Sequence, residues 1–429
     1  MWQRNLCTLP GFYATVALVA GCMTEHRGRF VALFVGLLLL TGLTLNSGPA
    51  VARTQIHAAG DAGALAGRGM WIWYVSRSNG GSISSIVASA HKYGINTVMI
   101  KSGDGRTMWS QFNPTLVQEL HASGLHVCAW QYVYGNFPRQ EANVGATAVH
   151  DGADCLIIDA ESEYEGKYVA AQSYITQLRN DIGQSFPVAL AGFPYVDYHP
   201  GFPYSIFLGP GGAQYNTPQM YWIDIGTSVN TVYAHTYAYN SVYERAIDPL
   251  GQVYSNPPFG QLIRFRQLSR TYGAAGVSWW DWQQASTSGW KGISIGAGNL
   301  TGVTATAATP ILKRGSLGDL VVWAQEHLAG AGYTIPIDGD YGPATQTTVE
   351  SFQAAEGLTA DGIVGPATWA ALLHFAPAAV TWTHTGAVTA SAAAVRSSRS
   401  AHRPLLMQVP KSAHARAVRD EIAGAGGAG

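Results

Sequence analysis

The chain is dominated by a regular alternation of strand-like and helix-like segments between residues 69 and 282. Short apolar runs bounded by turn residues predict eight strands, at 69–75, 96–101, 125–133, 154–161, 187–192, 218–222, 247–254 and 276–282. Helix-like segments lie at 82–93, 114–123, 141–149, 165–182, 227–243 and 259–272. This alternation predicts an α/β fold, a (β/α)8 TIM barrel over residues 69–293. A doubly wound open sheet is the alternative, but no Gly-rich phosphate-binding fingerprint supports it.

The fourth of these strands ends in two acidic residues, Asp159 and Glu161. Side chains alternate along a strand, so these two carboxylates point to the same side. The carboxyl ends of barrel strands form the mouth, where barrel enzymes hold their catalytic residues. The sequence therefore predicts an acidic pair in the mouth. The alternative is a solvated acidic loop that continues into Glu163 and Glu165.

The N-terminal segment has the pattern of a targeting signal. Positive charge at 26–29 precedes a nearly uninterrupted apolar run at 30–45, and Ala50-Val51-Ala52 has the form of a cleavage site. We predict a signal peptide over residues 1–52, with Met23 as an alternative start, and a Gly/Ala-rich lead segment over 53–68. An uncleaved membrane anchor is the alternative, and only then is a membrane a partner.

The composition narrows the possible ligands. Only 12% of the residues are charged and the formal net charge is −1, which argues against nucleic acid as a partner. The chain holds 13 Trp and 21 Tyr, and an aromatic, weakly charged surface suits uncharged polar ligands such as sugars. No His/Cys spacing indicates a metal site, and no cofactor is expected.

Two cysteines, Cys128 and Cys155, lie outside the predicted signal peptide, on neighbouring predicted strands. A disulfide between them is geometrically possible in an oxidising compartment. Two reduced thiols in the core are the alternative.

A second, smaller unit follows the barrel. Residues 294–310 are rich in Gly, Thr and Ala, which is typical of a flexible linker. In the compact region 311–374, an octet occurs twice, at 338–345 and 361–368, and each copy places an Asp-Gly turn before a Gly-Pro helix start. A capping-box-like pair, Ser316 and Asp319, precedes another helix, so three helices are expected. The Ala/Ser-rich region 375–429 is predicted to be a disordered, mildly basic tail.

This region resembles the peptidoglycan-binding module of bacterial wall hydrolases. The matching residues span the whole module and include Gln325, Asp338-Gly339, Tyr341-Gly342, Phe352-Gln353, Asp361-Gly-Ile-Val-Gly365 and Thr368-Trp369. The resemblance implies that peptidoglycan is the partner. Members of the family hold the ligand in a shallow groove, for which Tyr341, Gln353 and Trp369 are the candidates.

The segment Asp159-Ala160-Glu161 resembles the fourth-strand D-x-E motif of barrel lysozymes of glycoside hydrolase family 25 and, more loosely, of chitinase-like barrels. The resemblance implies that Glu161 is the proton donor and Asp159 its assisting carboxylate. The chain departs from both families. Barrel lysozymes have an aspartate at the end of strand one, where this chain has residues 73–75 (Trp-Tyr-Val), and the chitinase-like Tyr-Asp of strand six is replaced by Tyr221-Trp222 with Asp224 two residues later.

Further candidates lie at the ends of other predicted strands. Asp281 and Asp224 are possible additional catalytic carboxylates, as is Asp104 after strand two. The candidates for contacts to sugar rings and hydroxyls are Trp73, Lys101, Gln131, Tyr221, Trp222, Trp280 and Trp282. Each aromatic residue has packing in the core as its alternative, and Lys101 and Gln131 have the satisfaction of backbone groups.

These patterns together predict an exported protein of the cell wall that binds peptidoglycan and hydrolyses its glycan strands in the manner of a lysozyme. The alternative is a wall-binding or structural protein with a catalytically silent barrel. The absent strand-one aspartate favours this alternative, and the acidic pair opposes it.

Overall fold

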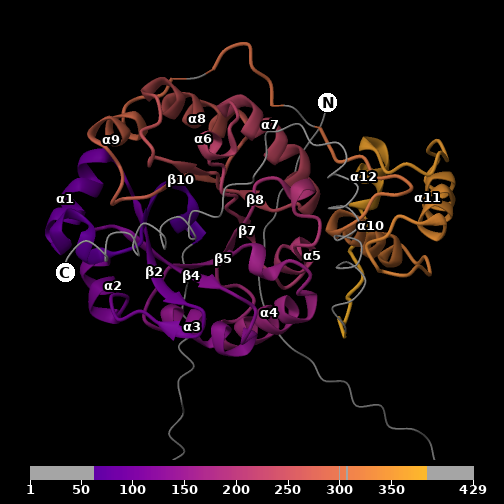
Figure 1. Ribbon diagram of the computed structural model, residues 1–429, viewed down its shortest axis with the longest axis horizontal. Coiled ribbons are helices and arrows are strands. Elements are labelled where there is room, and N and C mark those ends of the chain that lie inside the picture. Colours follow the sequence, from indigo (N-terminus) through magenta and orange to yellow (C-terminus); the bar gives the residue numbers. More distant parts are fainter. Residues whose placement is uncertain (1–61, 299, 306–307, 384–429) are drawn as a thin grey trace, which may run out of the picture. The chain divides into compact units, whose positions relative to one another are not determined.

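The computed structural model describes residues 62–298, 300–305 and 308–383 (Figure 1). The predicted signal peptide, the lead segment up to residue 61 and the tail from residue 384 lie outside the described residues. Within the described part, no helix is both long and apolar enough to cross a membrane.

The larger domain is built on one parallel sheet that lies at the centre of a ring of helices (Figure 1). Its strands run in the order β8-β7-β6-β5-β4-β2-β1-β10-β9. β8 and β9 are two parts of one stretch, interrupted at Asp248 and Pro249, so the two ends of the sheet meet and the strands close into a barrel. The strands are β1 (Gly67–Ile72), β2 (Thr97–Asp104), β4 (His126–Val133), β5 (Cys155–Ala160), β6 (Val188–Ala191), β7 (Tyr215–Asn216), β8 (Ala246–Ile247), β9 (Leu250–Gln252) and β10 (Gly276–Trp280).

The helices of the barrel follow the strands in the predicted order, which confirms the α/β barrel. They are α1 (Ile83–Tyr93), α2 (Pro114–Ala122), α3 (Pro138–His150), α4 (Tyr168–Ile182), α7 (Val229–Asn240) and α8 (Phe259–Thr271). The sequence patterns did not predict the short α5 (Tyr204–Phe207), α9 (Thr287–Ser294) or β3 (Thr107–Met108), which is antiparallel to β2.

The sixth strand differs from its prediction at 218–222. The strand is β7, at Tyr215–Asn216, and residues Trp222–Ile225 form the short helix α6. Pro218 has no backbone N–H to donate to a sheet ladder, so regular pairing ends before it. Beyond it, a single bridge joins Gln219 to Leu250.

Side-chain alternation divides the core into two layers. Inside the barrel, the tryptophans Trp71, Trp130 and Trp280 pack together with ring centroids 5.3 to 5.7 Å apart. The interior also holds Cys128 and Cys155, which pair directly across β4 and β5 and form a disulfide. The structure therefore has the disulfide rather than two free thiols.

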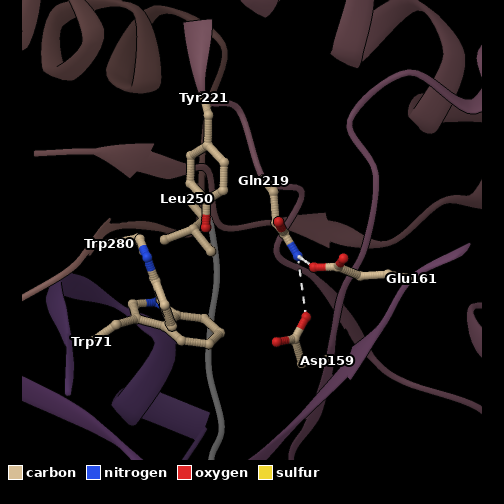
Figure 2. Close-up of a pocket in the computed structure, with 7 residues that line it drawn as sticks. All are labelled: Trp71, Asp159, Glu161, Gln219, Tyr221, Leu250 and Trp280. Carbon is tan, nitrogen blue, oxygen red and sulfur yellow. Dashed lines mark hydrogen bonds between the residues drawn. The ribbon is translucent and has the colours of Figure 1, made fainter. Parts of the chain in front are cut away.

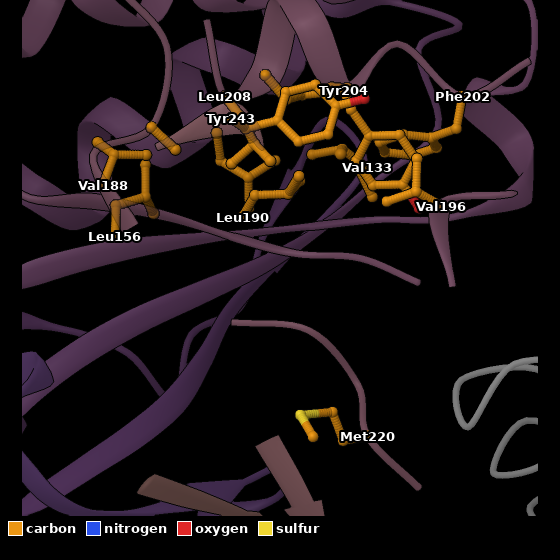
Figure 3. Packing of buried hydrophobic residues seen from close by; sticks show 14 of the residues in the cluster. Val133, Leu156, Val188, Leu190, Val196, Phe202, Tyr204, Leu208, Met220 and Tyr243 are labelled. Atoms are coloured by element: carbon orange, nitrogen blue, oxygen red, sulfur yellow. The ribbon is translucent and has the colours of Figure 1, made fainter. Parts of the chain in front are cut away.

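The outer layer lies between the sheet and the helices. Leu156, Val188 and Leu190 belong to the same buried apolar cluster as Leu208 and Tyr243 from the surrounding segments (Figure 3). Because neighbouring residues on a strand face opposite layers, a one-residue change of register would exchange the two sets.

The C-terminal module has the three predicted helices, α10 (Asp319–Gly330), α11 (Pro343–Ala355) and α12 (Pro366–Leu372). Each octet turn is held by one glutamine. The Gln325 amide donates to Asp338, the Asp340 carbonyl and Thr345, at 2.9 to 3.1 Å. Gln353 repeats this arrangement at the second octet, so the sequence repeat is also a structural repeat.

Asp319 does not form the predicted capping box with Ser316. Its side chain is fully buried and accepts hydrogen bonds of 2.8 Å from the hydroxyls of Tyr168, Ser205 and Tyr243. Residues 375–383, assigned to the tail by composition, also make ordered contacts, since the Trp382 ring lies 4.4 Å from that of Tyr168. The long-range hydrogen bonds of Asp319 thus replace the capping box that the local sequence predicts.

Asp248, which lies between β8 and β9, is expected to make the stability of the folded chain depend on pH. Burial raises its pKa from 3.8 to about 8, and a hydrogen bond with Ser278 opposes the shift only in part. A carboxyl whose pKa is higher in the folded than in the unfolded state stabilises the fold at pH values below its unfolded-state pKa. This stabilisation is lost as the pH rises through its folded-state pKa. We therefore expect Asp248→Asn to exceed the parent in free energy of unfolding at pH 8.5 by about 2–4 kcal/mol.

Urea unfolding of parent and Asp248→Asn at pH 5 and pH 8.5 measures this effect. Other buried acids of the chain titrate equally in both proteins, so the difference between the two isolates Asp248. Equal changes of stability with pH in parent and variant would contradict the prediction.

Candidate active site

The two predicted acids lie together at the carboxyl end of β5. Gln219 joins them, because its Nε2 donates to Asp159 Oδ1 at 3.1 Å and to Glu161 Oε1 at 2.9 Å (Figure 2). Since both oxygens accept from one nitrogen, they are at most about 6 Å apart. Asp159 is 5% exposed and Glu161 1%, so this is a buried pair and not a solvated acidic loop.

These residues line a pocket inside the mouth of the barrel. The polar groups and the rings are separated, with Asp159, Glu161 and Gln219 on one side and the rings of Trp71, Tyr221 and Trp280 on the other (Figure 2). Leu250 completes the lining. Such a pocket suits a ligand with one polar and one apolar face.

Burial and charge alter the acidity of this site. Desolvation and the Glu161 carboxylate raise the pKa of Asp159 well above its ordinary value, and the Lys101 ammonium opposes this. Burial and the neighbouring carboxylate therefore both favour the protonated form of Asp159. Burial likewise raises the pKa of Tyr132, whose hydroxyl donates to Glu163 at 2.7 Å.

Four of the predicted sugar-contacting residues face the barrel interior. Tyr221 and Trp280 line the pocket, and Trp73 packs against Trp280 at 5.7 Å between ring centroids. The buried Lys101 Nζ forms a 2.6 Å ion pair with Asp104 and lies 4.5 to 4.9 Å from three tryptophan rings. Lys101 is thus held within the wall of the mouth.

The other three point outward, toward the helices. Gln131 donates to the carbonyls of Gly105 and Glu141, both at 2.8 Å, so it satisfies backbone groups. Trp222 donates to Gln261 at 2.7 Å, and Trp282 donates to Asn79 at 2.9 Å; their rings belong to the outer apolar cluster. Gln131 lies on the outward face of β4, whereas Trp222 begins the helix α6 and Trp282 lies two residues beyond the end of β10.

The two additional carboxylates do not line the pocket. Asp224 lies on α6 and accepts a 2.6 Å hydrogen bond from Tyr254. Asp281 follows β10 and is buried, which raises its pKa to about 7, opposed by hydrogen bonds with Gln284. Among the described residues, no group of three or more His, Cys, Asp or Glu side chains is arranged to hold a metal ion.

Sequence reasoning missed Gln219, Trp71 and Leu250 in the pocket. Gln219 was detectable, because it lies two residues before Tyr221 in the predicted sixth strand. A lone amide in a sequence gives no signal of a site by itself, because its role depends on the two acids that it contacts in the folded chain.

The three candidates for peptidoglycan contact are buried inside the module. Tyr341 donates to the Gly362 carbonyl, and Trp369 donates to the Pro310 carbonyl, both at 2.9 Å. Gln353 holds the second octet turn. None of the three is more than 1% exposed, so they offer no surface to a glycan in this arrangement.

The Gln219 amide provides a direct test of the site. It stabilises the ionised forms of both acids by donating to them. Gln219→Met keeps the size of the side chain and removes the donor, so we expect kcat/KM of a reaction that uses these acids to fall roughly 10-fold. The activity profile is also expected to move to higher pH.

Rates across pH 4–9 measure both effects, with Gln177→Met on the outside of α4 as the control. A Gln219→Met profile that coincides with the parent profile would show that the amide does not act on the acids.

Comparison with known proteins gives matches of two kinds. Residues 318–372 match the family described as putative peptidoglycan binding domain. The zinc D-Ala-D-Ala carboxypeptidase of Streptomyces albus G is 49% identical over 61 residues, which are 14% of this chain and 24% of that protein. A probable N-acetylmuramoyl-L-alanine amidase of Bacillus licheniformis is 40% identical over 90 residues, or 20% of this chain and 25% of that protein. The chain thus spans about a quarter of the length of these relatives.

Among solved structures, the spore cortex-lytic enzyme of Bacillus megaterium is similar over 53% of this chain and 73% of that chain. The TM-score is 0.39 and the sequence identity 9%, so this likeness has no weight for the chemistry of the barrel.

Proposed function

We propose that the barrel acts on peptidoglycan, because residues 318–372 match the family of putative peptidoglycan-binding domains. The proposed activity is hydrolysis of glycosidic bonds in the glycan strands, by a protein that is exported to the cell wall. The two curated relatives named as a carboxypeptidase and an amidase cover only a part of this chain, so their chemistry is not carried over to the barrel.

The observation that carries the proposal is the buried acidic pair opposite a wall of aromatic rings. Hydrolysis of a glycoside requires an acid that protonates the leaving oxygen and a group that stabilises the positive charge developing on the ring. A sugar has an apolar ring face, which Tyr221 and Trp280 can contact, and hydroxyl or amide groups, which the opposite side can bind. We assign proton donation to Glu161 and stabilisation of charge to Asp159.

The arrangement of the two acids indicates which group attacks the anomeric carbon of the sugar. Asp159 and Glu161 lie on the same side of the pocket, joined by Gln219, and no third carboxylate of the described residues lines it. Peptidoglycan sugars carry an acetamido group, whose oxygen can bond to the anomeric carbon as the leaving oxygen takes the proton from Glu161. Water then attacks that carbon and returns a proton to Glu161. This route retains the anomeric configuration.

A silent, sugar-binding barrel is the second candidate. It is favoured by Trp73, whose buried ring occupies the strand-one end where barrel lysozymes have an aspartate. Incubation of the full chain with purified peptidoglycan separates the two. The hydrolase releases soluble reducing sugar, whereas the silent barrel sediments with the wall and releases none.

A further inference from the structure

One surface of the C-terminal module combines exposed apolar side chains with positive charge. A single antiparallel bridge joins Leu312 to Val364, with backbone hydrogen bonds of 3.0 and 2.8 Å between them. Both of these side chains are buried in the module. Because side chains alternate along paired segments, the residues next to this pair face outward. We call Ile311, Lys313 and Ile363 the outer face of the module.

The two isoleucines of the outer face are open to a partner. Ile311 is 55% exposed and Ile363 is 37% exposed, and they lie diagonally across the bridge. Gly365, opposite Ile311 in this register, has no side chain that could cover it; a Cβ placed there would lie 3.7 Å from Ile311 Cδ1. Two exposed isoleucines that are neighbours in space form an apolar surface that a ligand can bury.

Positive charge lies beside the isoleucines. Lys313 is opposite Ile363 in the same register, and the next residue, Arg314, is also exposed. Neither cation forms an ion pair with a described residue. The acid closest to Ile363 along the chain is Asp361. Its carboxylate is directed into the second octet turn, where it accepts from the Ile363 amide at 2.9 Å and from Gln353 at 3.0 Å.

This combination favours one part of peptidoglycan over the other. Sugar rings bind by stacking on aromatic rings, but the aromatic residues of the repeated motif, Tyr341 and Trp369, are fully buried. The peptide stems of peptidoglycan are rich in alanine and have free carboxylates. Their methyl groups suit the isoleucines, and their carboxylates complement the two cations. The outer face therefore fits a peptide stem better than a glycan strand.

We propose that the outer face binds the peptide stems of peptidoglycan, with alanine methyl groups against Ile311 and Ile363 and a stem carboxylate paired with Lys313. The module then holds the wall by its peptides and leaves the glycan strand to the barrel. The inference shares its choice of polymer with the proposed function, and it does not depend on hydrolysis by the barrel.

Calorimetry measures binding to the full chain carrying Glu161→Gln, so that no glycan is cleaved. The ligands are the wall pentapeptide of alanine, glutamate, lysine and two D-alanines, the same peptide with its carboxylates converted to amides, and a peptide-free tetrasaccharide of alternating N-acetylglucosamine and N-acetylmuramic acid. We expect Ile311→Ser and Ile363→Ser each to weaken both peptides about 5-fold. Lys313→Gln is expected to weaken only the peptide with free carboxylates, about 3-fold.

The matched controls are Ile295→Ser and Lys291→Gln on the barrel, where Ile295 is 42% exposed and Lys291 is also exposed. Neither is expected to change any affinity. The inference is overturned if neither peptide binds, if the outer-face variants bind both peptides like the parent, or if these variants weaken the tetrasaccharide instead. A parent chain that binds the pentapeptide and releases no reducing sugar would contradict the proposed function and leave this inference standing.

Discussion

Replacing Glu161 with glutamine is expected to lower the release of reducing sugar from peptidoglycan by about 10²–10⁴-fold. Glutamine has nearly the same size and still accepts the hydrogen bond from Gln219, but it has no acidic proton for the leaving oxygen. The module, which contains no part of the pocket, is expected to bind the wall as before. Initial rates with the full chain and sedimentation with insoluble peptidoglycan measure the two properties in one tube.

Glu119→Gln, on the exposed face of α2, is the matched control because it removes one carboxylate elsewhere on the barrel. It is expected to retain the parent rate. If Glu161→Gln hydrolyses at the parent rate, Glu161 is not the acid. If it loses both activity and its cooperative unfolding transition, then the substitution has damaged the fold, and Asp159→Asn provides the second test of the pair.

Removal of the disulfide is expected to produce the largest loss of stability. Cys128 and Cys155 are separated by 27 positions, and a crosslink over such a loop contributes about 3–4 kcal/mol by restricting the unfolded chain. The double variant Cys128→Ala, Cys155→Ala is expected to lose this amount and to melt roughly 10 °C lower. Alanine is chosen because both positions are fully buried, where a serine hydroxyl would lack a partner.

Urea unfolding and thermal melting measure the loss, each with and without a thiol reductant. The reductant is expected to destabilise the parent and to leave the double variant unchanged, which separates the crosslink from the lost sulfur atoms. A double variant as stable as the parent, or a parent that is insensitive to reduction once unfolded, would contradict the prediction.

The sequence predicted those parts of the fold that depend on strand periodicity. Asp159 and Glu161 were placed on one side of a buried strand because a period of two allows no other arrangement. The same period explains the error at Gln131, which is adjacent to the inward-facing Trp130 on β4 and therefore faces outward. Trp222 begins the helix α6 and Trp282 lies beyond the end of β10, so strand alternation does not extend to either residue. A pattern identifies where a strand ends, but which alternate set faces the interior depends on register, and the β2–β4 pairing shifts register between Lys101 and Gly103.

Long-range contacts could not be predicted from local patterns. The partner of both acids is Gln219, 58 residues after Glu161, and Asp319 bonds to a tyrosine 151 residues earlier. In the module, the repeated octets correctly predicted the turns and helices. The residues that define the repeat, including Gln353 and Trp369, are buried because they hold these turns together, so a motif that identifies the module does not by itself identify its binding surface.

The most direct test of the account compares two products in a single digest of purified peptidoglycan by the full chain. New reducing ends report cleavage of glycosidic bonds, and new free amino groups report cleavage of peptide or amide bonds. If the barrel hydrolyses glycosidic bonds, reducing ends increase with time while free amino groups stay at the level of the undigested wall. An increase of free amino groups without reducing ends, or protein bound to the wall with neither product, would contradict it.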